Sequence, residues 1–485
     1  GHKLTLGMTS GNRNVATVYA GKGASATSRS HLTIKDTQGT GELVLSGEET
    51  ASKTANAIRA EQNAEIDIQV PVKITGVTAP YAAQAIWAAR DSSITLKRLT
   101  MTQVDGSGNT AAANKNVYGI GLNGSKTQIA VTEDADISGV KGISLYSMSG
   151  ADNDSKLSIG GGRIIAPEES TNTKNYWAVY AAKGNVVLNE NKDRDLTVVG
   201  NMQAGEGAAA VIDASFTTPT SSWKGAVKRT DSSIALKSTT NLTLTNGATW
   251  THEVQSGILK GDSTFKESHL TKLTGGDSLA TAGVVKQGAK NILIDSYSGD
   301  TRFIFEHDGV DPKQIKGGNI TITSAAAGSH VTFSTNPDAN ITDSNIKDVL
   351  KGLANKLYYT KYKDGETNLS GTAEVNEGLV SSAAKWAGTI TYNSTTGQGT
   401  YDPSATPSQP ATEQQKAEFT SQITSGNVSE YVTNKVEKTT GIYTFTKDST
   451  LKSDRYNGAI LGEAQPITIN AADKTLTIEA KKTDN

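Results

Sequence analysis

The sequence predicts an all-β fold, a parallel β-helix with three short strands in each coil. Three observations support this prediction. Short strands centred on isoleucine or valine recur at a mean interval of about 31 residues, a period typical of repeat proteins. A second strand follows four of the six after 8 or 9 residues, as from Ile58 to Ile66. Aromatic residues make up only 6% of the chain, which suits a narrow core with much solvated strand surface.

The first strand of each predicted coil is centred on an apolar residue that mostly follows alanine or glycine. The central residues are Ile58, Ile86, Ile120, Ile143, Val179 and Val211. The second strands start at Ile66, Ile94, Ile129, Leu157, Val187 and Ile234, and the third strands at Val72, Leu99, Ile137, Ile164, Leu196 and Leu242. The longer connections are polar, as expected for insertions at the corners of a β-helix. A propeller does not fit, because Asn-Gly and Asp-Gly hairpins are not regularly placed.

The chain is predicted to have three parts. Residues 1–342 form a parallel β-helix, residues 343–430 form a helix-and-hairpin insertion, and residues 431–485 form further β-helix coils. We expect the whole to be a fragment of a longer protein, since strand-like sequence runs to both ends.

The predicted insertion departs from the repeat pattern. Apolar residues at helical spacing predict a helix at 344–361, with Asp343 or Ser344 as its N-cap. A shorter helix is predicted at 412–423. Two short strands flanking residues 393–398 predict a hairpin.

Composition excludes several classes of function. The chain has no cysteine, which excludes disulfides and thiolate zinc sites and suits export as an unfolded thread. With 47 basic and 49 acidic residues, the net charge is −2, and no basic stripe suggests nucleic acid. No apolar run is long enough to span a membrane as a helix.

The sequence predicts no catalytic residue, metal ion or cofactor, and therefore no enzyme. A β-helix lyase needs carboxylates stacked on adjacent coils, usually with calcium and a neighbouring base. The predicted second strands instead present Asp67, Thr95, Ala130 and Ser158 at equivalent positions. Asp134 and Asp136 are interpreted as solvated turn carboxylates. The chain contains no Gly-x-Ser-x-Gly motif, and its histidines lie in separate strands or turns.

Binding is the function that the residues favour. Aromatic and cationic side chains on the first-strand face and in the polar insertion at 217–231 are candidates for contact with a ligand, because such side chains anchor protein contacts or stack on sugar rings. The candidate binding residues are Arg59, Tyr81, Trp87, Arg90, Tyr176, Trp177, Tyr180, Trp223, Lys224 and Arg229. The competing interpretation is that several of these aromatic residues fill the interior.

Two stretches carry a resemblance to a known family. The first leads from Ile346-Lys347-Asp348-Val349-Leu350 through Gly388-Thr389-Ile390-Thr391-Tyr392 to Gly397-Gln398-Gly399-Thr400-Tyr401. The second is Ile292-Leu293-Ile294-Asp295-Ser296-Tyr297-Ser298-Gly299. Both resemble the passenger domains of type V autotransporter adhesins of diderm bacteria. The resemblance implies a right-handed parallel β-helix, display at the outer membrane or secretion, and a membrane-bound C-terminal β-barrel that this chain lacks.

The leading hypothesis is a cell-surface adhesin fragment that takes part in attachment, coaggregation or biofilm formation. Its expected partners are a host cell-surface protein or glycan, or the surface of another bacterium, with self-association as a further possibility. One alternative is a calcium-dependent β-helix polysaccharide lyase or glycan hydrolase. Another is a passive stalk that carries a binding tip elsewhere.

Overall fold

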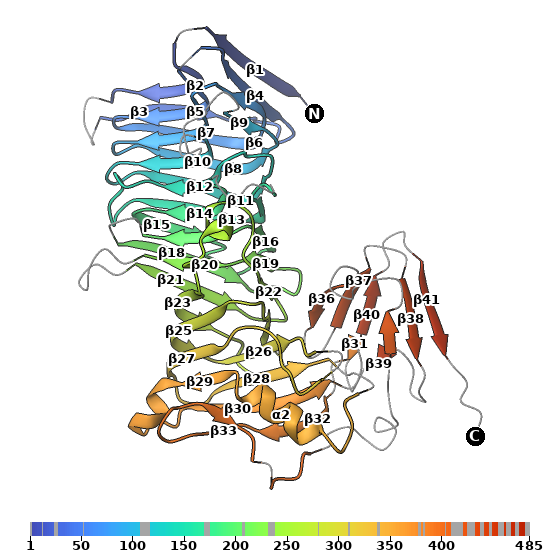
Figure 1. Cartoon of the computed structure of the whole chain (residues 1–485). Helices are drawn as coiled ribbons and strands as arrows, with labels where there is room; N and C mark the ends of the chain where they lie inside the picture. Colours follow the sequence, from blue (N-terminus) through green and yellow to red (C-terminus); the bar gives the residue numbers. More distant parts are fainter. Residues whose placement is uncertain are drawn as a thin grey trace. The chain divides into compact units, whose positions relative to one another are not determined.

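A computed structural model gives the fold of the chain (Figure 1). It describes residues 2–480 except 12, 24–27, 52, 107–116, 169–174, 206–208, 231–237, 280, 309–310, 337–339, 377–379, 382–383, 403, 409–420, 424–431, 437–440, 446–448, 454–459, 462–466 and 471–474. The described chain is nearly all β, and most of its strands pair in parallel. This confirms the all-β prediction and the parallel pairing.

The chain divides into two compact units. The first contains Gly1–Phe216, Ser222–Leu242 and Val254–Leu270, and the second contains Thr217–Ser221, Thr243–Glu253 and Thr271–Asn485. The division cuts the two strands β21 (Thr239–Leu244) and β23 (Glu267–Thr274).

Sheet B of the first unit contains five of the six predicted first strands, those around Ile58, Ile86, Ile120, Ile143 and Val179. Its eight strands follow one another in parallel, as Figure 1 shows for β2, β5, β7, β10, β12 and β14. They are β2 (Val15–Gly21), β5 (Thr54–Glu61), β7 (Ala82–Ala89), β10 (Tyr118–Asn123), β12 (Ile143–Ser147), β14 (Trp177–Ala181), β17 (Met202–Ala204) and β20 (Val227–Arg229).

Sheet A of the first unit contains the predicted second strands at Ile66, Ile94, Ile129, Leu157 and Val187 and the predicted third strands from Val72 to Leu196, together with strands that the sequence did not predict. The second strand predicted at Ile234 lies outside the described residues. Its strands are β1 (Lys3–Ser10), β3 (Ser30–Ile34), β4 (Glu42–Glu49), β6 (Ala64–Thr78), β8 (Ser93–Met101), β9 (Val104–Asp105), β11 (Gln128–Ile137), β13 (Lys156–Ile165), β15 (Gly184–Leu188), β16 (Leu196–Val199), β18 (Ala210–Phe216) and β19 (Ser222–Gly225). The predicted register is confirmed, because Ile94 pairs with both Ile66 and Ile129. The second and third strands join into one long strand with a register shift, as in β6.

The predicted first strand around Val211 is wrong. Val211 belongs to β18 of sheet A, where it pairs with Asn185. The strand of sheet B that follows β14 is instead β17, in which Met202 pairs with Val179. The sequence pattern misses β17 because this strand has only three residues.

The second unit continues the parallel pairing. Its strands include β22 (Thr249–His252), β24 (Gly283–Lys286), β25 (Asn291–Ser298), β26 (Asp300–Phe305), β27 (Ile320–Ala325), β28 (Ser329–Thr335), β29 (Leu357–Tyr359), β30 (Leu369–Asn376) and β32 (Ala384–Thr389). Val285, Phe303 and Phe333 occupy one register position and are fully buried. β32 departs from the pattern by pairing antiparallel with β30.

The predicted helix and hairpin are confirmed in the second unit. The helix α2 (Ile346–Ala354) is shorter than predicted, and its N-cap is Asn345 rather than Asp343 or Ser344. A 3-10 helix, η1, spans Thr360–Asp364. The hairpin pairs β33 (Thr391–Tyr392) with β34 (Gly399–Thr400). The helix predicted at 412–423 lies outside the described residues except at its end, which is strand β35 (Ser421–Ile423).

Three small sheets contain the remaining described strands. β31 (Val380–Ser381) pairs with β39 (Ile460–Leu461). The other two sheets contain β35, β38 (Ser449–Ser453) and β41 (Leu476–Ala480), and β36 (Val432–Val436), β37 (Gly441–Phe445) and β40 (Ile467–Asn470). The division of the chain at 342 and 430 stays a prediction.

Candidate functional site

One face of sheet B collects aromatic and charged side chains in a single register column. Adjacent strands of a sheet lie about 4.8 Å apart, so register partners on one face are close neighbours. The column contains Tyr19, Arg59, Trp87, Gly121, Tyr146, Tyr180, Gln203 and Lys228. We call this side of the sheet the aromatic face.

A second column on the aromatic face arises because the strands depart from strict alternation. In the first six strands of sheet B, the strand pairing skips one position, and each strand has a small residue there. These residues are Thr17, Ala57, Ala85, Gly119, Ser144 and Ala178. Residues on the two sides of this interruption, three apart in sequence, share a face. Trp177 and Tyr180, for example, stack with ring centroids 5.8 Å apart.

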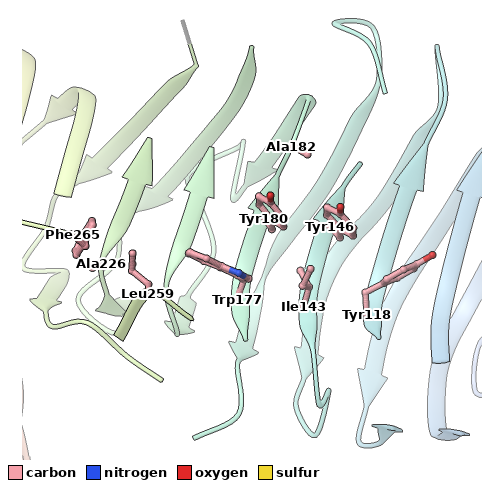
Figure 2. Packing of buried hydrophobic residues seen from close by; sticks show 9 residues of the cluster. All are labelled: Tyr118, Ile143, Tyr146, Trp177, Tyr180, Ala182, Ala226, Leu259 and Phe265. Carbon is pink, nitrogen blue, oxygen red and sulfur yellow. The ribbon is translucent and has the colours of Figure 1, made fainter. Parts of the chain in front are cut away.

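The aromatic rings form a continuous series across four strands. The centroid of Tyr118 lies 6.0 Å from that of Trp87 and 5.9 Å from that of Tyr146. Tyr146 stacks on Tyr180 at 5.1 Å with an interplanar angle of 5°. Figure 2 shows the tyrosines on consecutive strands, with Trp177 beside them. Such ring pairs stabilise a structure by about 0.5–1.5 kcal/mol each beyond their burial.

The series is continuous because the ring of Tyr118 lies over Gly121. A Cβ atom at Gly121 would lie 2.2 Å from Cε2 of Tyr118. The glycine therefore leaves a space in the register column, and the tyrosine ring fills it between Trp87 and Tyr146.

The segment Val254–Leu270 covers one end of the aromatic face, and we call it the covering segment. It contains the short helix α1 (Ile258–Gly261) and contributes Leu259 and Phe265 to the cluster that includes Trp177 (Figure 2). At this end Trp177 and Tyr180 are each only 3% exposed. The aromatic face is here a second hydrophobic core.

Asn201 attaches the covering segment to sheet B. Its amide nitrogen donates to the carbonyl oxygens of Gln255 and Ser256, each at 3.2 Å. Its side-chain oxygen accepts from the backbone N–H groups of Gln255 at 2.9 Å and Ala226 at 3.2 Å. A single buried amide thus satisfies four backbone groups, which buried polar groups require.

An ion pair adds to this attachment. Nζ of Lys228 lies 3.0 Å from Oδ2 of Asp262. Hydrogen bonds from Thr264 and from Lys228 hold the pKa of Asp262 well below its usual value, so this carboxylate is ionised at neutral pH.

The other end of the aromatic face is more open. Tyr19 is 49% exposed, and Arg59 donates to Oδ1 of Asn56 at 3.1 Å and to Oε1 of Glu61 at 2.8 Å. Trp87 is half-buried. In the part of the chain that the structure describes, neither Nε1 of Trp87 nor the hydroxyl of Tyr118 has a hydrogen-bond partner, although both atoms are buried.

Several predicted binding residues come together on the aromatic face. Arg59 and Trp87 are register partners, and Trp177 and Tyr180 belong to the covered end. Tyr176 is also buried beside Trp177. The burial of these three aromatic residues agrees with the competing interpretation that such residues fill the interior.

Two further predicted residues lie outside the columns. Tyr81 is 52% exposed before β7. Arg90 is exposed at the turn after β7, with a left-handed backbone at φ 58°. Its backbone N–H donates to the carbonyl oxygen of Asn123 at 3.2 Å.

The prediction that Trp223 lies in an exposed polar loop is wrong. Trp223 belongs to β19, is buried, and donates from Nε1 to the carbonyl oxygen of Gly200 at 3.1 Å. Its ring stacks on Phe216 with centroids 6.4 Å apart. Lys224 is half-buried in the same strand, and Arg229 is half-buried in β20.

Tyr19, Tyr118 and Tyr146 belong to the aromatic face but are not among the predicted binding residues. The predicted centre of β12 at Ile143 is wrong, because Leu145 is the register partner of Ile120 and Val179, and Tyr146 therefore stands in the column. A spacing of three residues between apolar residues identifies Tyr146. This spacing occurs in β12 between Ile143 and Tyr146 and in β14 between Trp177 and Tyr180.

The acidic and histidine side chains of the described residues are dispersed. Within the described ranges, no three His, Asp or Glu side chains lie together as a metal site would require. Asp134 pairs with Arg194 at 3.3 Å, and Asp136 pairs with Arg163 at 3.5 Å. His252 is buried against Gln287, and burial lowers the pKa of His252 to about 4, so its ring is neutral at pH 7.

Comparison with known proteins adds no relative. No family model matches the chain, and neither a curated protein nor a solved structure matches it. None of the helices among the described residues has the length and apolar character needed to cross a membrane.

Proposed function

We propose that this chain is part of a bacterial cell-surface adhesin, a type V autotransporter passenger. Its parallel sheets would belong to a right-handed β-helix, with attachment to a host surface or to another bacterium as its role. The parallel pairing of strands at intervals of about 30 residues supports this architecture, because each coil of a β-helix adds one strand to each sheet.

The observation that carries the binding role is the open end of the aromatic face. Tyr19, Arg59 and Trp87 stand in consecutive register positions. Exposed Tyr81 lies just before the strand that carries Trp87. Tryptophan, tyrosine and arginine are the residues that contribute most of the binding energy at protein interfaces.

The test uses the whole chain displayed on beads. Capture of epithelial cells, of immobilised glycans and of partner bacteria is compared with capture by beads that carry an unrelated β-helix of similar length. We expect specific capture in at least one of the three assays. The double variant Tyr19→Ser/Tyr81→Ser is expected to lower it at least fivefold, since both side chains are about half exposed.

The matched control is Leu279→Ser. Leu279 is 50% exposed and belongs to the second unit, so this variant removes a similar apolar area elsewhere. Capture should be unchanged by this substitution. If the folded chain captured nothing in any assay, the adhesin proposal would be contradicted.

A passive stalk is the second candidate, and the covered end of the aromatic face favours it. There Trp177 and Tyr180 pack beneath the covering segment and stabilise the fold. If the unrelated β-helix supported capture as well as this chain does, the stalk would replace the adhesin as the better explanation.

A further inference from the structure

We infer that the aromatic face, at the place where its two ends meet, binds a carboxylate of an acidic glycan through Arg59, Trp87 and Tyr118. We call these three residues the donor cluster. The inference rests on the proposed binding function and names the class of ligand.

Two buried donors of the cluster lack an acceptor. The indole N–H of Trp87 and the hydroxyl of Tyr118 are buried, and neither has a partner among the described residues. An indole N–H can only donate. Burial raises the pKa of Tyr118 well above its usual value, although the charge of Arg59 opposes this rise, so the phenol keeps its proton. Because native structures rarely leave such groups unpaired, an acceptor from a ligand is expected here.

The three residues are neighbours on the aromatic face. Trp87 is the register partner of Arg59, and its ring lies 6.0 Å from that of Tyr118. Figure 2 shows the hydroxyl of Tyr118 pointing away from Tyr146, toward the strands that precede β10. β7 and β5 carry Trp87 and Arg59 on that side.

Arg59 favours a carboxylate as the acceptor, even though its ion pair with Glu61 at 2.8 Å offsets part of its charge. A guanidinium has more N–H groups than the two that Arg59 uses for Asn56 and Glu61. These two contacts hold the guanidinium in place, so less entropy is lost when a ligand binds. A carboxylate oxygen accepts from arginine in a charge-assisted hydrogen bond that is about twice as strong as a neutral one.

The neighbouring ring favours a sugar over an acidic peptide as the carrier of this carboxylate. Tyr19 is the register partner of Arg59 and is half exposed. A Cβ atom at Gly21 would lie 2.3 Å from its hydroxyl, so the ring lies flat along its own strand. Adjacent strands lie about 4.8 Å apart, so this flat ring lies close to Arg59. A sugar ring that is linked to the acidic sugar can stack on it.

The test measures binding of oligosaccharides to the whole chain by calorimetry. The probes are a hyaluronan octasaccharide, sialyllactose and a galacturonate hexamer, each beside its carboxyl-reduced counterpart. At least one carboxylated probe should bind at least tenfold tighter than its reduced counterpart. Tyr118→Phe and Arg59→Gln should each weaken this binding about tenfold or more, as expected for the loss of a charge-assisted hydrogen bond.

Matched controls separate binding from folding. Tyr297→Phe removes another buried tyrosine hydroxyl, which donates to the carbonyl oxygen of His330 at 2.7 Å, and Arg163→Gln removes a cation paired with Asp136. Both should leave oligosaccharide binding unchanged. Circular dichroism of every variant shows whether it is folded.

Two results would overturn the inference. One is equal binding of the carboxylated and reduced probes, or no binding of either, by the folded chain. The other is preferred binding of polyglutamate, which would identify an acidic peptide as the ligand. If beads still captured cells in a Tyr19-dependent manner after either result, the proposed adhesin function would stand without this ligand.

Discussion

The two ends of the aromatic face use the same side chains in different ways. At one end Trp177 and Tyr180 are buried beneath the covering segment, and at the other Arg59 and Trp87 lie beside half-exposed Tyr19. Both ends belong to one sheet with the same strand spacing and the same register columns. The difference therefore comes from the covering segment, and each residue's role depends on what lies above the sheet.

The largest effect is expected from truncating a ring at the covered end. Trp177→Ala should lower the free energy of unfolding by about 4 kcal/mol, as large aromatic truncations in a core do. Tyr19→Ala at the open end should change it by less than about 0.5 kcal/mol, like other surface substitutions. Urea denaturation followed by circular dichroism measures both. Similar losses for the two variants would remove the distinction between the ends.

Removing the attachment of the covering segment should have the next largest effect. Asn201→Ala leaves four buried backbone groups without their partner, and an unfolding free energy lower by about 3 kcal/mol is expected. The exposed apolar cluster should also bind the dye ANS. The control is Asn241→Ala, which removes one bond, to Asp213 at 2.6 Å. Unchanged stability of Asn201→Ala would mean that the covering segment is held by its apolar contacts alone.

A smaller effect is expected where the two ends meet. Gly121→Ala places a methyl group against the ring of Tyr118, and the resulting crowding should destabilise the fold by about 2 kcal/mol. At Gly76 an added Cβ would meet only Oε1 of Gln103, at 3.8 Å, so Gly76→Ala should be tolerated. Thermal unfolding compares the two variants. Equal melting temperatures would show that Tyr118 moves aside freely.

The register of sheet A follows directly from the sequence. Ile66, Ile94 and Ile129 share one position because β-branched residues alternate with polar ones in strands that have one buried face. A one-residue slip would turn these side chains to the other face, so the pattern specifies the register strongly.

The aromatic face was harder to predict because both faces of sheet B are buried at its covered end. Every residue of β12 and of β14 is buried, so hydrophobicity there does not distinguish one face from the other. The interruption at Ser144 and Ala178 also replaces the period of two with a spacing of three. This is why the sequence pattern centred the strand on Ile143, whereas Leu145 is the register partner of Ile120 and Val179. The covering segment comes from residues far along the chain, which a local pattern does not relate to Trp177.

The smallest expected effect compares two buried tyrosine hydroxyls. Tyr297 donates to the carbonyl oxygen of His330, so Tyr297→Phe should cost about 1 kcal/mol of stability. Tyr118→Phe removes a hydroxyl that has no partner in the described chain, so its stability should be unchanged or slightly higher. Urea denaturation of both variants without ligand decides this. A loss for Tyr118→Phe as large as that for Tyr297→Phe would mean that the hydroxyl is already satisfied, by water for example. The open end would then be a packed core like the covered end, with no unpaired hydrogen-bond donor available to a ligand.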